Sequence, residues 1–340
     1  MLDRLFLIAN EEYLSSQSGG GNDVKSDLHA LQKIFKEVRV ISLARNYKND
    51  TIKNITKGVD YLFFSGFLSF ERFFRQVNPI DFRENKRITN VKDLHFFREL
   101  RFEILSGDNS GKHKAIMERE LTVYKYSDLI LSYSDDEIRL INRLDQGINI
   151  KKHFYHNPEF IPPSPEGFKY NNKLVFIGNF EHQPNLDGIL SFDSNFYFNK
   201  SEFIFEIYGK YAKEKLFNRQ LRNNFNIIGE VKSPAECYAQ GGLFISPIRY
   251  GGGIKIKIIE AALSSLQIVA TPESVEGLNL TPNLSYIPLS NNAHLNDTLI
   301  KFKEKDINLR KIAHQGRKSI SQISNEKIVY ENLNQTIQSL

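Results

Sequence analysis

The sequence of 340 residues has a single cysteine, Cys237, and no tryptophan. One thiol forms neither an intramolecular disulfide nor a cysteine-built metal site. No apolar run approaches the roughly 18 residues of a membrane span, and the stretch from Leu5 to Ala9 is too short for a signal-peptide core. Glycine and proline fill only 20 and 11 positions, which excludes collagen-like and low-complexity chains. We therefore expect a globular cytoplasmic protein.

The charge is nearly balanced, with a net charge of +5. This excess is small, and no helix-turn-helix, zinc or RNA-binding aromatic signature accompanies it, so we expect no nucleic-acid partner. The densest basic stretch runs from Arg83 to Arg101 and is interleaved with phenylalanines. It fits either a solvated helix face or a surface for an anionic bilayer or a phosphorylated substrate.

Short apolar runs of strand length alternate with segments of helical periodicity in both halves of the chain. Continuous apolar strands separated by helices are typical of parallel sheets that are covered on both faces. The sequence therefore predicts an α/β protein with two Rossmann-like, doubly wound domains that face a cleft. The predicted strands are 4–9, 38–43, 61–64, 87–91, 129–132 and 153–155, then 174–177, 203–208, 226–228, 243–246, 268–270 and 286–289.

Prolines concentrate between the halves, where residues 158–165 hold four of the 11 in the chain. Proline lacks a backbone donor and favours extended geometry, so we predict an interdomain linker at 158–166. The N-terminal acceptor-side domain is then 1–157, and the C-terminal donor domain is 167–320. We expect residues 321–340 to form a helix that packs back toward the N-terminal domain.

The most informative segment predicts a strand, a glycine loop at Gly251–Gly253, and a helix. Lys255 and Lys257 fall at the start of that helix with no acidic residue beside them, and cations there oppose the helix dipole unless an anion is bound. Arg249 offers a planar fork for phosphate oxygens. Glu260, one turn deeper, is suited to ribose hydroxyls. The alternative is a glycine turn with solvated lysines and a helical Lys–Glu pair.

With these residues the sequence resembles the GT-B glycosyltransferases, specifically the family-four-like enzymes that use nucleotide sugars. The resemblance extends over most of the chain. It is carried by residues 176–188, 227–231, 244–263, 269–271 and 276–278 in the second half, and by 19–21, 93–99 and 127–134 in the first.

On the donor side, the resemblance implies that Arg249, Lys255 and Lys257 hold the diphosphate and act in catalysis, and that Glu260 holds the ribose. The other implied donor-binding residues are glycines and a valine, whose backbone approaches the nucleotide. They are Gly20, Gly21, Gly178, Gly229, Val231 and Gly253. The alternative for Gly19–Gly21 is a flexible surface loop.

On the acceptor side, the resemblance implies that His95 is a catalytic residue and that Asp93 and Arg98 lie beside it. The alternative for His95 is a structural histidine. An acceptor on a lipid-linked or surface glycan, with peripheral contact at the cytoplasmic face of the inner membrane, would use the basic stretch from Arg83 to Arg101.

The sequence also departs from the family. Gly252 stands where this class often has the first glutamate of a Glu-x7-Glu pair, which removes a covalent intermediate at that position. The chain has no Asp-x-Asp, so we expect no metal and no cofactor. The substrate that the resemblance implies is a nucleoside-diphosphate sugar. Family likeness favours retention of configuration, while inversion with His95 as base stays open. The alternatives are an epimerase or phosphorylase of this fold, or an inactive nucleotide-binding subunit.

Overall fold

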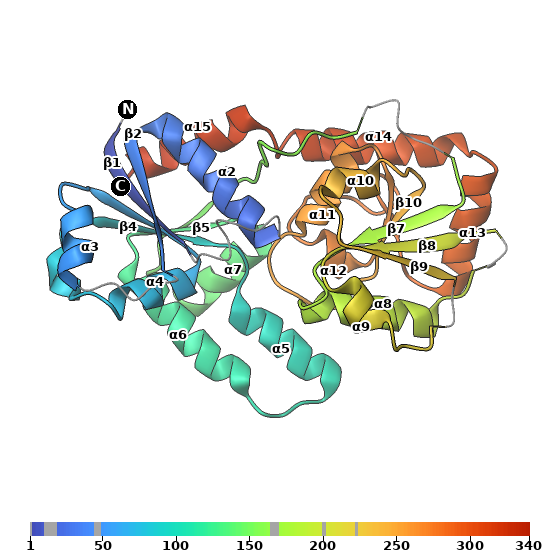
Figure 1. Cartoon of the computed structure of the whole chain (residues 1–340), viewed down its shortest axis with the longest axis horizontal. Coiled ribbons are helices and arrows are strands. Elements are labelled where there is room, and N and C mark those ends of the chain that lie inside the picture. The colour runs from blue at the N-terminus through green and yellow to red at the C-terminus, as the bar shows by residue number, and fades with distance from the viewer. Residues whose placement is uncertain (1, 10–18, 44–48, 164–169, 199–201, 222–223) are drawn as a thin grey trace. The chain divides into compact units, whose positions relative to one another are not determined.

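The computed structural model describes the whole chain except residues 1, 10–18, 44–48, 164–169, 199–201 and 222–223 (Figure 1). It divides into two compact units, and each contains one six-stranded sheet. The first unit is Met1–Pro158 with Gly252–Ile254 and Ile323–Leu340, and the second is Glu159–Gly251 with Lys255–Gln322. Part of the predicted linker at 158–166 lies outside the described residues.

The sheet of the first unit is parallel and has the order β2-β1-β3-β4-β5-β6. Its strands are β1 (Leu2–Ala9), β2 (Phe35–Ser42), β3 (Tyr61–Ser65), β4 (Lys86–Val91), β5 (Leu129–Ser132) and β6 (Ile150–Lys152). The helices of this unit are α2 (Gly19–Ile34), α3 (Asn49–Ile55), α4 (Phe67–Phe74), η1 (Pro79–Phe82), α5 (His95–Ser106), α6 (Lys112–Tyr126), α7 (Asp135–Leu144) and α15 (Glu326–Gln338).

The sheet of the second unit is also parallel, with the order β12-β11-β10-β7-β8-β9. Its strands are β7 (Lys173–Ile177), β8 (Ile204–Tyr208), β9 (Phe225–Gly229), β10 (Leu243–Ser246), β11 (Gln267–Ala270) and β12 (Ile287–Pro288). Its helices are α8 (Gln183–Asn195), α9 (Ala212–Leu216), α10 (Pro234–Tyr238), α11 (Ile256–Leu263), α12 (Pro272–Val275), α13 (Asn292–Lys303) and α14 (Ile307–Ser321).

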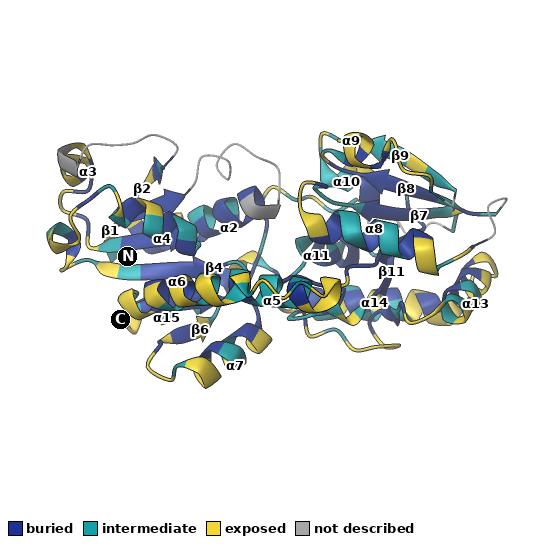
Figure 2. Ribbon diagram, turned by 90° about the horizontal axis from the view of Figure 1, so that it is seen from below, coloured by how far each residue is buried: buried dark blue, intermediate teal, exposed yellow. Residues whose placement is uncertain are grey.

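Both faces of each sheet are buried, which explains the continuous apolar strands (Figure 2). In β1, Leu5 and Leu7 belong to one core cluster, and Phe6 and Ile8 belong to another, because successive side chains point to opposite faces. The first of these clusters also contains Leu333 of α15. The α/β, doubly wound fold class predicted from the sequence is therefore confirmed.

The predicted strand at 153–155 is wrong, because β6 ends at Lys152. Its pairing with β5 aligns Ile150 with Ile130, and His153 is the first residue beyond the strand. The His153 side chain is fully buried and lies 3.2 Å from Asp27, so it joins a polar cluster at the end of the sheet.

The basic stretch from Arg83 to Arg101 is not one helix face. It runs through a turn, then β4, a short loop, and the first half of α5. Arg83 and Lys86 therefore lie near the beginning of β4, whereas His95 and Arg98 lie beyond its end. The strand separates the two groups, so the stretch forms no single basic surface.

Two topological switch points follow from the strand orders. They lie between β1 and β3 in the first sheet and between β7 and β10 in the second, where chain connections leave in opposite directions. Open parallel sheets bind ligands outside the carboxyl ends of strands at such points. None of the helices in the described part of the chain is long and apolar enough to span a membrane.

Candidate functional site

The donor-side residues predicted from the sequence gather at the switch point of the second unit. Gly178 follows β7, and Arg249 follows β10. Lys255 is the N-cap of α11, and its side chain makes no cap hydrogen bond. The first turn of that helix contains no acidic residue. The amide groups at this helix start are therefore oriented as they are in sites that bind anions.

Asn185 and Phe176 enclose the amine of Lys257. Its Nζ donates a hydrogen bond to Oδ1 of Asn185 at 2.6 Å and lies 4.2 Å from the centroid of the Phe176 ring. Burial, and then the charge of Lys255, lower the pKa of Lys257 to about 7. A β-carbon on Gly178 would lie 2.9 Å from the side-chain amide of Asn185 and 3.0 Å from this Nζ, so a larger residue there would crowd both side chains.

Arg249 has a carboxylate partner that the sequence did not reveal. Its Nε donates to Asp187 of α8 at 2.9 Å, and its Nη2 donates to the other oxygen at 2.5 Å. This bidentate pairing raises the pKa of Arg249. To contact a phosphate group, the Arg249 guanidinium must either leave Asp187 or contact Asp187 and the phosphate at the same time.

Glu260 is buried, with 4% of its surface exposed, and is oriented by a tyrosine. The hydroxyl of Tyr238 donates to Oε2 of Glu260 at 2.9 Å. Tyr238 ends α10, 22 residues before Glu260 in the chain, and no spacing rule predicts this contact.

Gly229 ends β9 with φ of 86°, and its carbonyl oxygen accepts from Gly209 at 2.6 Å. Val231 follows two residues later in the chain.

The glycine loop divides between the units, because Gly252–Ile254 belongs to the first one. A β-carbon on Gly253 would lie 2.2 Å from the carbonyl oxygen of Lys92, and one on Gly252 would lie 2.9 Å from Cβ of Asp93. We predicted these glycines for close approach to a phosphate. In the structure, Gly252 and Gly253 pack closely against residues 92–94.

The acceptor-side residues lie together in the first unit, at the carboxyl end of β4. Nε2 of His95 lies 3.3 Å from Oδ1 of Asp93, and Arg98 pairs with the other oxygen of that carboxylate. The His95 ring also meets Phe67 edge to face, with centroids 4.9 Å apart.

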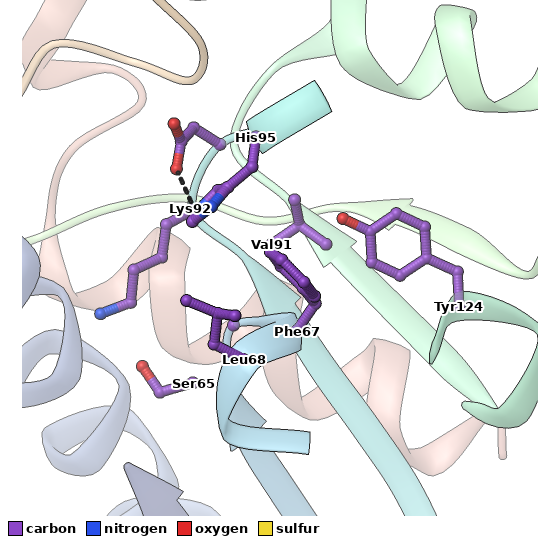
Figure 3. A pocket seen from close by; sticks show the side chains of 9 residues that line it. Ser65, Phe67, Leu68, Val91, Lys92, His95 and Tyr124 are labelled. Carbon is purple, nitrogen blue, oxygen red and sulfur yellow. Dashed lines mark ion pairs between the residues drawn. The ribbon is translucent and has the colours of Figure 1, made fainter. Parts of the chain in front are cut away.

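Asp93, His95 and Phe67 line a pocket that is partly open to solvent (Figure 3). Its lining residues are Ser65, Gly66, Phe67, Leu68, Val91, Lys92, Asp93, His95 and Tyr124.

Two buried glutamates hold the loop that carries His95. Glu120 of α6 accepts hydrogen bonds from the amides of His95 and Phe96, at 3.1 and 2.8 Å. Oε1 of Glu137 accepts from the amides of Leu94 and Gly253, at 3.0 and 2.8 Å. Carboxylates at a helix start satisfy amides that have no partner within the helix.

Burial also changes the acidity of these two carboxyl groups. It raises the pKa of Glu120, and it raises that of Glu137 to about 7. Sequence reasoning missed both residues. One signal was present for Glu137, because Ser134-x-x-Glu137 begins a helix and Ser134 caps it.

Gly20 and Gly21 lie in the first turn of α2, so the alternative of a surface loop is wrong for them. The first turn of α2 contains no acidic residue. The described structure therefore places both glycines at a second helix start that follows a parallel strand, the kind of position at which phosphate groups bind.

The comparisons with known proteins agree with this geometry. Residues 171–283 match the family model described as Glycosyl transferases group 1. No curated protein matches the sequence.

Among solved structures, Alr3699/HepE from Anabaena in complex with UDP has a TM-score of 0.70 and 11% identity, with 100% of both chains covered. Sucrose-phosphate synthase from Thermosynechococcus elongatus has a TM-score of 0.75 and 11% identity, covering 100% of this chain and 99% of its own. TarM from S. aureus has a TM-score of 0.61 and 16% identity, covering 80% of this chain and 54% of its own.

The two Rossmann-like sheets and these likenesses define the fold class, which is GT-B. Residues 171–283 are a domain of the Glycosyl transferases group 1 type. The resemblance inferred from the sequence is confirmed at this level.

Proposed function

We propose that the protein transfers a sugar from a nucleoside-diphosphate sugar to a hydroxyl group of an acceptor glycan. The observation that carries this proposal is the start of α11, where Lys255 and Lys257 meet a helix N-terminus without an acidic residue in its first turn. The group 1 match over the same segment, and the UDP and UDP-glucose bound in the HepE structures, support it.

In this proposal Lys255 and Lys257 bind the donor diphosphate, and Arg249 joins them when it leaves Asp187. Negative charge grows on the diphosphate as the glycosidic bond breaks, so fixed cations stabilise the transition state more than the bound donor. Glu260, oriented by Tyr238, accepts hydrogen bonds from the ribose. The backbone of Gly229 and Val231 faces the base.

We infer that the transfer proceeds with retention and without a metal ion. Position 252 is glycine and offers no nucleophile, so the acceptor hydroxyl attacks on the face that the diphosphate leaves. A phosphate oxygen then takes its proton. His95, with its imidazole beside Asp93, binds the acceptor near the reacting hydroxyl.

The proposed acceptor belongs to a lipid-linked or surface glycan, with the protein in the cytoplasm and in peripheral contact with the inner membrane. The basic residues Arg83, Lys86 and Arg87 supply that contact. Because these residues lie at or before the start of β4 and His95 lies beyond its end, the membrane contact and the acceptor pocket are distinct. Sedimentation with anionic vesicles at low and high salt tests the contact, which should be lost when all three residues are replaced by glutamate.

A panel of UDP-, GDP- and dTDP-sugars tests the proposed reaction. A donor at 100 times its dissociation constant should stabilise the protein by about 2.7 kcal/mol, seen as a rise in the unfolding temperature. The donor found in this way should be hydrolysed slowly without acceptor and transferred with it, also in the presence of EDTA. Interconversion of free nucleotide sugars, with no transfer, would instead identify an epimerase.

A further inference from the structure

The side chain of Asn185 connects two segments of the candidate donor site. Asn185 lies in the first turn of α8 and is 6% exposed. Its Oδ1 accepts a hydrogen bond from Nζ of Lys257 at 2.6 Å, and its Nδ2 donates to the carbonyl oxygen of Asn179 at 2.7 Å. The amide of Asn185 therefore links the loop after β7 with the first turn of α11.

These two contacts fix the direction in which the amide faces. An ammonium group only donates hydrogen bonds, and a carbonyl oxygen only accepts them. If the amide were turned over, its nitrogen would face Lys257 and its oxygen would face the Asn179 carbonyl, and both hydrogen bonds would be lost. The same Asn179 carbonyl oxygen accepts from the amide of His182 at 3.2 Å, in the turn that leads into α8. The acceptor for the Lys257 amine is thus held in place by the backbone.

The amide holds Lys257 without bringing a negative charge to the site. Arg249 of the same site is held differently, by the carboxylate of Asp187, with Nε at 2.9 Å from Oδ2. A carboxylate partner attracts the cation that a phosphate group would also attract. The neutral partner of Lys257 leaves the whole charge of the ammonium group available to an anion.

The hydrogen bond to Asn185 also acts on the protonation of Lys257. Burial, and then the charge of Lys255, lower the pKa of Lys257 to about 7, whereas Cys237 and Glu260 act in the opposite direction. An acceptor within hydrogen-bonding distance stabilises the charged amine more than the neutral one. Asn185 therefore opposes the effect of burial.

We propose that Asn185 is a positioning residue of the donor site, whose neutral amide holds the Lys257 amine in place and favours its charged form without competing for the donor diphosphate. A carboxylate at position 185 would keep the amine charged but would repel the diphosphate. An alanine would provide neither the contact nor the stabilisation of the charge. This inference rests on the proposed function and assigns a role to a residue that acts through Lys257.

An NMR titration of the full chain, labelled with ¹³C at Cε of lysine and free of nucleotide, tests the proposal. Lys257→Met assigns the signal of Lys257. We expect Asn185→Asp to raise the pKa of Lys257 by about one pH unit or more, and Asn185→Ala to lower it. A residue with a merely structural role would not shift this pKa in opposite directions.

Asn195→Asp and Asn195→Ala are the matched controls. Asn195 is an exposed residue of the same helix, and its Nδ2 donates to the carbonyl oxygen of Ser191 at 2.8 Å. Neither control should move the pKa of Lys257. Aspartate closely matches asparagine in shape, so Asn185→Asp decides the test if Asn185→Ala does not fold.

Nucleotide binding gives a second readout, with whichever of UDP, GDP and dTDP binds the wild type. Asn185→Ala should weaken binding roughly tenfold, the effect of one lost hydrogen bond to a charged group. Asn185→Asp should also weaken it and should abolish proton uptake at pH 8, because the Lys257 amine is then charged before the nucleotide binds.

The proposal is overturned if Asn185→Asp leaves the pKa of Lys257 unchanged, or if both Asn185 variants move it in the same direction. The NMR titration needs no nucleotide, so its outcome is separate from that of the proposed function. Failure of all three nucleotides to bind would count against the donor site, whereas an unchanged pKa in Asn185→Asp would count against the role of Asn185.

Discussion

Gly253 and Lys92 pack backbone to backbone, so closely that a β-carbon on Gly253 would lie 2.2 Å from the Lys92 carbonyl oxygen. Gly253 also has φ of 59°, a conformation that side-chain-bearing residues rarely adopt. The glycine loop is therefore fixed against the residues that precede His95. This relationship ties the segment before Lys255 to the acceptor-side loop.

Gly253→Ala should lower the rate of transfer at least tenfold, because the loop must move away from Lys92 to accept a methyl group. Gly111→Ala is the control, since Gly111 has φ of 69° and nothing within 4 Å of the added carbon. Left-handed backbone strain of roughly 1–2 kcal/mol is common to both variants. Steady-state kinetics and thermal unfolding measure the difference, and equal effects in the two variants would refute the packing argument.

Glu137→Ala should impair folding stability and transfer, whereas Glu137→Gln should retain most of both. In the alanine variant the amides of Leu94 and Gly253 lose their acceptor, at about 1–3 kcal/mol for each buried group left unsatisfied. The amide oxygen of glutamine accepts from both, and its nitrogen can donate to Ser132, whose hydroxyl now donates to Oε2 at 3.0 Å. Faster hydrogen exchange at Leu94 and Gly253 in the alanine variant alone is the direct readout.

Glu137 also predicts a dependence of stability on pH. Its pKa is raised from 4.5 to about 7, so the native protein retains a proton that the unfolded chain releases. The stabilisation from that proton is present below pH 4.5 and is lost as the pH rises to about 7. Urea unfolding of wild type and Glu137→Gln at pH 5 and pH 8 isolates the contribution of Glu137 to the free energy of unfolding. We expect the variant to gain stability relative to wild type at pH 8, and no relative change would contradict the burial of the charge.

Lys257 should make nucleotide binding proton-linked. Its pKa of about 7 in the free protein must rise when a diphosphate binds, because the charged amine is then stabilised. Affinity for a nucleoside diphosphate should therefore fall between pH 7 and pH 9, by up to about tenfold per pH unit. Calorimetry in buffers of different ionisation enthalpy should detect proton uptake at pH 8. Uptake should vanish in Lys257→Met and persist in Lys301→Met, an exposed lysine of α13.

Asp187 should compete with the donor for Arg249. Asp187→Asn weakens the ion pair and should tighten nucleotide binding about two- to fivefold, the size of an exposed pair. Arg249→Ala should weaken binding, and adding Asp187→Asn to it should then change nothing. If Asp187→Asn also tightens nucleotide binding in the Arg249→Ala variant, its effect on the nucleotide does not operate through Arg249.

The sequence predicted the sheets well because their strands are buried on both faces and read as continuous apolar runs. The error at 153–155 arose where His153 is buried by polar contacts with Asp27 that are distant in the chain. For the site, periodicity and the glycine loop indicated Lys255, Lys257 and Glu260. The partners Asp187 and Tyr238 could not be predicted, since their contacts depend on how α8 and α10 pack on the sheet.

Calorimetric titration with nucleoside diphosphates, in wild type and in site variants, tests the central claim most directly. We predict that at least one of UDP, GDP and dTDP binds the wild type without a metal. Lys255→Ala and Lys257→Ala should each weaken that binding at least tenfold, the loss of a charge-assisted contact. Glu260→Gln should weaken it through the ribose, and Lys301→Met should leave it unchanged. Absence of binding by all three nucleotides, or wild-type affinity in both lysine variants, would contradict the assignment of α11 as the donor site.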